Sequence, residues 1–242
     1  MPAERSFVIP VLDFSRHSPY NIFTLLTDLQ GVAGEVICVF NGADVHRALR
    51  EHPRIDRYCF NSQNAGVSRS WNIGINLAEG RSVFVLNADL HVSPLAIEQL
   101  ERYLFELPDA VIVGPQGTRV DAERLEILAY YSKGDFDAPV RTDDVSGFCF
   151  ALHRERFLAH GLAFDVRYSP CFMEEWDMGM QVKRAGLACY AVPVTEFEHH
   201  WGVSAARGDV RLAYFGREVS RDDVLEANRA KFLEKWFGTK SP

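Results

Sequence analysis

The chain has 242 residues, a length that suits one sizeable globular domain, and 47% of its residues are hydrophobic, which argues against extensive disorder. Its formal net charge of -7 excludes a broad positive surface for duplex nucleic acid. No apolar run reaches the roughly 18 to 20 residues of a membrane span, and the short polar start leaves no room for a signal peptide. We therefore expect a cytoplasmic protein.

The five cysteines are odd in number, widely separated and set mostly among apolar residues, without a Cys-x-x-Cys pair. This distribution indicates reduced core residues of a cytosolic protein. They are Cys38, Cys59, Cys149, Cys171 and Cys189.

The first half of the chain alternates short runs of β-branched and aromatic residues with helical patterns, which is typical of a largely parallel sheet with crossover helices. Gly80 suits a left-handed helix stop, and Ser93 followed by Pro94 suits a helix start. The predicted strands are 7–11, 35–40, 56–60, 82–86 and 110–114, and the predicted helices are about 18–30, 67–78 and 94–107.

The second half is less regular and contains no repeat or linker, so we expect a single domain. Its last helix has an apolar face that either packs against the core or lies on an anionic membrane surface. The predicted strands are 148–152, 187–192 and 195–200, the segment 164–170 is extended, and the predicted helices are 154–160, 174–185 and 222–237.

Asn or Asp follows four of the predicted strands. Each of these residues alone could be an ordinary turn former. Because the carboxyl ends of parallel strands meet at one edge of the sheet, where open α/β sheets bind ligands, together they predict a crevice suited to a nucleotide base and ribose. The residues are Asp13, Asn41, Asn61, Asn64, Asn87 and Asp89.

Three acids crowd the start of a predicted helix in Glu174-Glu175-Trp176-Asp177. One or two acids there would be explained by the helix dipole. Three acids beside a Trp also repel one another, which raises the pKa of at least one and makes it a candidate general base.

Two histidines, His199 and His200, follow in the chain. Together with the carboxylate of Asp89, one of them could complete a mixed oxygen and nitrogen site for Mn or Mg. Zinc is disfavoured because no Cys or His pair has zinc-ligand spacing.

Taken in order, these motifs resemble the inverting, metal-dependent glycosyltransferases of family two, especially rhamnosyltransferase-like members. The resemblance covers nearly the whole chain and also includes the closing Asn228 to Trp236. The matching motifs are Asn64-Ala65-Gly66, Asn72-Ile73-Gly74, Ala78-Glu79-Gly80, Asn87-Ala88-Asp89, Gly147-Phe148, Phe164-Asp165, Glu174-Glu175-Trp176-Asp177 and His200-Trp201-Gly202-Val203-Ser204.

The resemblance implies a GT-A fold, which is a Rossmann-like, mostly parallel mixed sheet flanked by helices. Residues 1–114 would be the nucleotide-binding half, and 115–242 the acceptor and catalytic half. Asp89 and His200 would hold the metal, and Glu175 would be the base, with Asp177 and Glu174 as alternatives. The residues expected to contact the donor are Pro10, Asp13, Asn41, Asn64, Gly66, Asn72, Asn87 and Asp89.

The implied reaction moves a hexosyl or deoxyhexosyl group, with inversion, from a nucleoside-diphosphate sugar to a hydroxyl of a saccharide or lipid-linked acceptor. Such an enzyme would serve polysaccharide or glycan biosynthesis and would need a divalent cation, Mn or Mg. With a lipid-linked acceptor, the enzyme could contact the inner face of the membrane peripherally.

The chain differs from the family pattern at Glu175 and Phe40, where Asp is usual, and at Gln181, where Arg is usual. These differences leave open a catalytically weak sugar-nucleotide-binding module of a larger assembly. A nucleotidyltransferase is disfavoured, because the segment from Val11 to Pro19 contains no glycine and only Arg16 as a basic group apart from His17.

Overall fold

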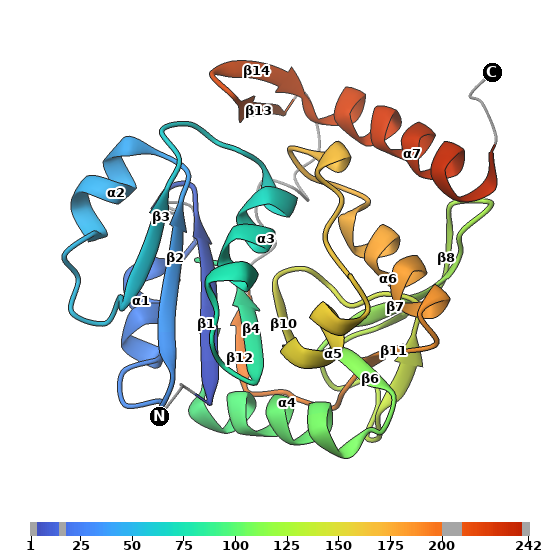
Figure 1. Cartoon of the computed structure of the whole chain (residues 1–242), viewed down its shortest axis with the longest axis horizontal. Coiled ribbons are helices and arrows are strands. Elements are labelled where there is room, and N and C mark those ends of the chain that lie inside the picture. The colour runs from blue at the N-terminus through green and yellow to red at the C-terminus, as the bar shows by residue number, and fades with distance from the viewer. Residues whose placement is uncertain (1–3, 15–17, 200–209, 239–242) are drawn as a thin grey trace.

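The computed structural model describes residues 4–14, 18–199 and 210–238, which form an eight-stranded sheet between two layers of helices (Figure 1). The strand order is β3-β2-β1-β4-β10-β6-β11-β9. Parallel pairs dominate, while β10 and β9 run antiparallel to their neighbours, so the predicted mixed and mostly parallel sheet is confirmed. The strands are β1 (Arg5–Val11), β2 (Glu35–Phe40), β3 (Arg57–Phe60), β4 (Ser82–Leu86), β6 (Ala110–Gly114), β9 (Val140–Thr142), β10 (Cys149–His153) and β11 (Ala188–Ala191).

Helices cover both faces because the central strands are apolar on both sides. In β1, Phe7 and Ile9 pack in one hydrophobic cluster with α1, α2 and α4, while Val8 packs in a second cluster with α3, α5 and α6. The helices are α1 (Ile22–Asp28), α2 (Ala43–Leu49), α3 (Val67–Leu77), α4 (Pro94–Glu106), α5 (Arg154–Ala159), α6 (Glu174–Arg184) and α7 (Arg221–Phe237), with a 3-10 turn η1 (Val166–Tyr168).

Three two-stranded sheets complete the described fold. The first brings residues far apart in sequence together, because His199 of β12 pairs with Leu90 of β5, directly after Asp89. The pairs are β5 (Leu90–Val92) with β12 (Phe197–His199), β7 (Gly117–Asp121) with β8 (Glu126–Tyr131), and β13 (Arg211–Tyr214) with β14 (Arg217–Ser220).

Several local predictions were wrong. The helix expected over 18–30 begins only at Ile22, because the side chain of Asn21 accepts hydrogen bonds from the first-turn N–H groups and caps it there. The segment 164–170 is not extended throughout, since it contains η1. The sequence did not predict α2, β5, β9, β7–β8 or β13–β14, all of which are short.

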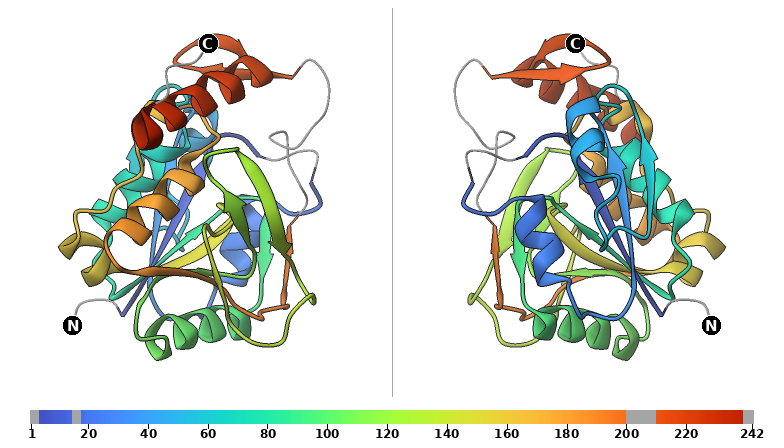
Figure 2. Two further views of the ribbon diagram at one scale, coloured as in Figure 1. Left: turned by 90° about the vertical axis from the view of Figure 1, so that its right-hand side faces the viewer. Right: turned by 90° about the vertical axis from the view of Figure 1, so that its left-hand side faces the viewer.

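The apolar face of α7 packs against the rest of the domain, which is one of the two predicted alternatives. Phe232 is fully buried against Tyr168 and Met173, with Trp176 beside them. Figure 2 shows α7 and the β13–β14 hairpin at the same end of the molecule. Within the part of the chain that is described, none of the helices has the length and apolarity needed to span a membrane.

Candidate active site

The ends of β1 and β2 border an open pocket of about 620 Å³, which includes the first turn of α2. Asp13 lines this pocket and is exposed, and Pro10 is partly exposed in β1. Phe40, where the family usually has Asp, is instead fully buried and its ring contacts His46 and Tyr58. Its side chain therefore lies in the core, not in the pocket.

Asn41 directly precedes Gly42 of the pocket lining and is only 5% exposed. Its amide nitrogen donates to the Val39 carbonyl and Ser70 Oγ, and its oxygen accepts from Asn61 Nδ2 and the N–H of Ala65. Both donors and both acceptor positions of the amide are thus used inside the protein. In this conformation Asn41 shapes the loop between β3 and α3.

Three other residues that were predicted to contact the sugar nucleotide connect the α3 region to the second half of the chain. Asn64 Nδ2 donates to the Ala213 carbonyl at 2.7 Å, and Asn72 exchanges two hydrogen bonds with the backbone of Phe164 at 2.7 and 3.0 Å. Gly66 has a φ of +90°, and a Cβ there would lie 2.9 Å from Ser169 Oγ, so a glycine is required. The side chains of Asn64 and Asn72 therefore hold the α3 region against the second half of the chain.

The end of β4 brings Asn87 and Asp89 to His199. Asp89 Oδ1 lies 3.4 Å from His199 Nε2, and Asn87 Nδ2 lies 3.5 Å from the same nitrogen. The side chains of Asp89 and His199 are 17% and 8% exposed. His200, which was predicted to bind the metal, lies outside the described residues.

The donor chemistry of this pair fits a divalent cation of the Mn or Mg type, since it combines a carboxylate oxygen with an imidazole nitrogen. Two cis ligands at about 2.1 Å from an octahedral cation stand about 3 Å apart, and the 3.4 Å separation is close to this. Across residues 4–14, 18–199 and 210–238, no group of three or more His, Cys, Asp or Glu side chains has metal-site geometry. Phosphate oxygens and water would have to complete the ligand shell.

The acids at the start of α6 differ in burial. Glu174 is 4% exposed and its Oε2 has no hydrogen-bond partner, whereas Glu175 is half-buried. Burial, and then the charge of Glu175, raise the pKa of Glu174 well above its usual range. Burial also raises the pKa of Glu175, while backbone N–H groups, including that of Gly147, lower it. Glu174 therefore retains a proton more readily than Glu175.

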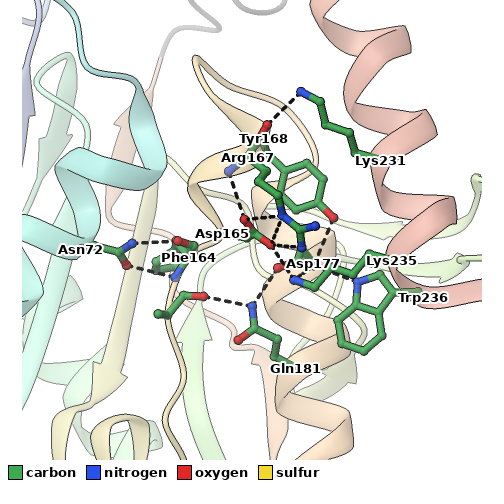
Figure 3. Close-up of polar contacts among 11 residues, drawn as sticks. Asn72, Phe164, Asp165, Arg167, Tyr168, Asp177, Gln181, Lys231, Lys235 and Trp236 are labelled. Carbon is green, nitrogen blue, oxygen red and sulfur yellow. Dashed lines mark hydrogen bonds and ion pairs between the residues drawn. The ribbon is translucent and has the colours of Figure 1, made fainter.

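Asp177 lies in an internal polar network and is fully buried (Figure 3). Its Oδ1 accepts from Trp236 Nε1 at 2.8 Å and from the Tyr168 hydroxyl at 3.2 Å, and pairs with Lys235 Nζ at 2.6 Å. Gln181 Nε2 donates to its Oδ2 at 2.7 Å. These contacts suit a structural anchor, and they conflict with the expectation that Asp177 serves as an alternative base.

Lys235 is a site-supporting residue that the sequence did not predict. It reaches from α7 to both Asp165, at 2.9 Å, and Asp177, and so places a cation beside the same carboxylate to which Gln181 donates. Burial alone would raise the pKa of Asp165, but hydrogen bonds from Arg167 and Lys235 outweigh burial and lower the pKa. The only sequence signal was a Lys-Trp pair on the last helix.

Comparison with known proteins assigns the chain to a family. The family model described as "Glycosyl transferase family 2" matches residues 33–159, just over half of the chain. No curated protein matches the chain.

A solved structure described as "Crystal structure of GalNAc-T7 with UDP, GalNAc and Mn2+" superimposes with a TM-score of 0.71 at 13% identity. The match covers 98% of this chain and 48% of that one, so the chain spans about half the length of that protein. At this identity the likeness shows the fold alone, which is GT-A. By the match of its family model, the chain belongs to glycosyl transferase family 2.

Proposed function

We propose that the protein transfers a hexosyl or deoxyhexosyl group, with inversion, from a nucleoside-diphosphate sugar to a hydroxyl of a saccharide or lipid-linked acceptor. Polysaccharide or glycan biosynthesis in the cytoplasm would be its setting. The observation that best supports this proposal is the convergence of Asp89 and His199 at the end of β4, in a chain of this family.

Asp89 and His199 would hold the cation, with His200 as the second candidate, and the pocket beside Asp13 would receive the nucleoside. A bound Mn or Mg ion would offset the negative charge that grows on the departing diphosphate. Two protein ligands leave coordination positions for phosphate oxygens, which suits a cation that binds together with its donor.

Glu175 would accept the proton of the attacking acceptor hydroxyl. Burial raises the pKa of Glu174 well above its usual range and also raises that of Glu175, while backbone N–H groups lower the pKa of Glu175, so Glu175 is the acid of the pair that gives up its proton more readily. Glu175 is also the more exposed of the two, whereas Asp177 is enclosed by donors. Glu175 is therefore the best-placed base of the three.

The test is release of nucleoside diphosphate from a panel of UDP-, GDP- and TDP-sugars with Mn or Mg. We expect Asp89→Ala to lose most metal-dependent turnover, and Glu175→Gln to lower kcat by about 10²- to 10⁴-fold while donor binding is retained. Asp222→Ala and Glu226→Gln, which remove exposed acids of α7, are the matched controls.

Full transfer activity in Glu175→Gln would refute the assignment of Glu175 as the base. Donor binding without turnover for any acceptor would instead support a sugar-nucleotide-binding module. The Mn²⁺ affinities of His199→Asn and His200→Asn tell which histidine binds the metal. We expect the larger loss of Mn²⁺ affinity for His199→Asn.

A further inference from the structure

Gly147 and Phe148, the two residues directly before Cys149 of β10, contact both halves of the proposed site. The Phe148 carbonyl accepts a hydrogen bond from the N–H of Asn87 at 2.8 Å, which ties β10 to the end of β4. Gly147, one residue earlier, faces Glu175 on α6. The carboxylate proposed as the base and the pair proposed to bind the cation are therefore joined through one dipeptide.

Phe148 contacts the cation half through its ring. The ring stacks on the imidazole of His199, with centroids 4.4 Å apart and planes inclined by 11°. Phe148 is only 5% exposed and also contacts the ring of Phe197. This packing restricts rotation of the imidazole and keeps Nε2 directed at Asp89.

Gly147 contacts the base half through its lack of a side chain. A Cβ at this position would lie 2.5 Å from Glu175 Oε1 and 2.6 Å from Cη2 of Trp71. The carboxylate thus occupies the space that a side chain at 147 would need. Trp71 cannot give way easily, because it is 2% exposed and wedged against Phe150 and Phe164.

We propose that Gly147 and Phe148 are positioning residues, in which Gly147 seats the carboxylate of Glu175 and Phe148 orients His199. Neighbouring Cα atoms are about 3.8 Å apart, so the peptide between these residues sets the spacing of base and cation. Attack opposite a leaving group needs that spacing to be constant. The inference rests on the proposed function for its meaning, but its test needs no turnover.

Substitutions at the two residues should give a crossed pattern, in which each changes one measurement and leaves the other unchanged. Gly147→Ala should displace Glu175 from the backbone N–H and raise its titration midpoint by about one to two pH units, with Mn²⁺ affinity unchanged. Phe148→Leu should weaken Mn²⁺ binding about tenfold and leave the titration of Glu175 unchanged.

The titration is followed by NMR of ¹³C-carboxyl-labelled glutamate, with Glu175→Gln for assignment, and Mn²⁺ binding by electron paramagnetic resonance of the free ion. The ionisable groups facing Glu175 are Glu174, Asp144, Cys171 and Cys189, and all are retained in both variants.

Gly80→Ala is the control for crowding, because its Cβ would lie 2.6 Å from backbone atoms of Arg5 and Ser6, before the start of β4 and so at the opposite end of that strand from Asn87; neither readout should move. If Gly147→Ala does not fold, the double variant Trp71→Leu with Gly147→Ala removes the second clash and keeps the contact with Glu175. An unchanged or lowered Glu175 midpoint, or equal loss of Mn²⁺ affinity in both variants, would overturn the inference. A crossed pattern in a protein that transfers no sugar would refute only the proposed function.

Discussion

Hydrogen-bond and charge partners assign different chemistry to buried acidic residues that are neighbours in the sequence. Glu174 and Asp177 are both buried, yet Glu174 has an oxygen without a partner while Asp177 contacts a Lys, a Trp, a Tyr and a Gln. An unpaired buried carboxyl favours its neutral form, whereas cationic and N–H donors favour the carboxylate. Position on the helix therefore determines which acid can take part in proton transfer.

Asp144 is a third buried acid, and it makes the stability of the fold depend on pH. Burial raises the pKa of Asp144 from 3.8 to about 7, against the effect of its hydrogen bond with Thr118. The pKa of Asp144 is therefore higher in the folded protein than in the unfolded chain. The neutral carboxyl contributes its full stability to the fold below about pH 4, and this contribution is lost as the pH rises to 7. The difference corresponds to on the order of 4 kcal/mol.

We therefore expect the free energy of unfolding of the wild type to fall between pH 4.5 and 7.5, measured by urea denaturation. It should fall less steeply in Asp144→Asn, with a residual slope from Glu174 and Glu175, whose pKa values are also raised. Asp137→Asn, at an exposed position, should match the wild type. Equal slopes in all three proteins would contradict the role of Asp144.

At the scale of elements, α7 supports the turn that leads into α6. Phe172 and Met173 have φ values of +78° and +74°, which are unusual for residues with side chains. Asn228, 1% exposed, donates to the carbonyls of Tyr168 and Cys171 at 2.7 and 2.8 Å and to that of Phe172 at 3.2 Å. One buried amide thus holds the strained approach to the acidic helix start.

Lys235 provides a second test at this scale. Lys235→Met leaves the buried carboxylate of Asp177 without its cation, and we expect a loss of about 3 to 5 kcal/mol in the free energy of unfolding. Arg229→Met, which removes an exposed ion pair on the same helix, should cost no more than about 0.5 kcal/mol. Chemical denaturation measures both, and equal losses would show that the Asp177 pair does not stabilise the fold.

The Asp177→Asn and Lys235→Met double variant separates anchoring from catalysis. If Asp177 is an anchor, the double variant should recover part of the stability lost by Lys235→Met. If Asp177 were the base, each Asp177 variant would lose turnover even where the fold is intact.

Whole-molecule packing bears on the alternative of a membrane-bound last helix. The apolar side chain of Phe232 is fully buried against η1 and α6, so α7 belongs to the folded domain. Deletion of residues 221–242 would expose Tyr168 and Met173. We expect the deleted protein to bind a hydrophobic dye and to lose cooperative thermal unfolding, whereas deletion of 239–242 should change neither. Unaltered unfolding after the longer deletion would show that α7 is dispensable for the fold.

The central sheet was predictable because its information is local. Strands such as β4 and β6 are continuous apolar runs, and a buried strand of this kind needs helices on both faces. The motif order also predicted the family. In contrast, α2 has only seven residues, and β8 alternates weakly with mostly exposed side chains, so neither pattern stands out from loop sequence.

By itself, the sequence determined the α/β class, the main strands and the set of polar residues at the strand ends, since each depends on periodicity or residue type over a short window. Only the tertiary structure decided which of those residues remain available for a ligand. Asn41 and Asn72 have amides of the same kind as Asn87, yet they form their hydrogen bonds inside the protein. Asn87 and Asp89 instead lie beside His199. Partners distant in sequence settle that distribution, because a buried polar group binds whatever donor or acceptor the fold brings to it.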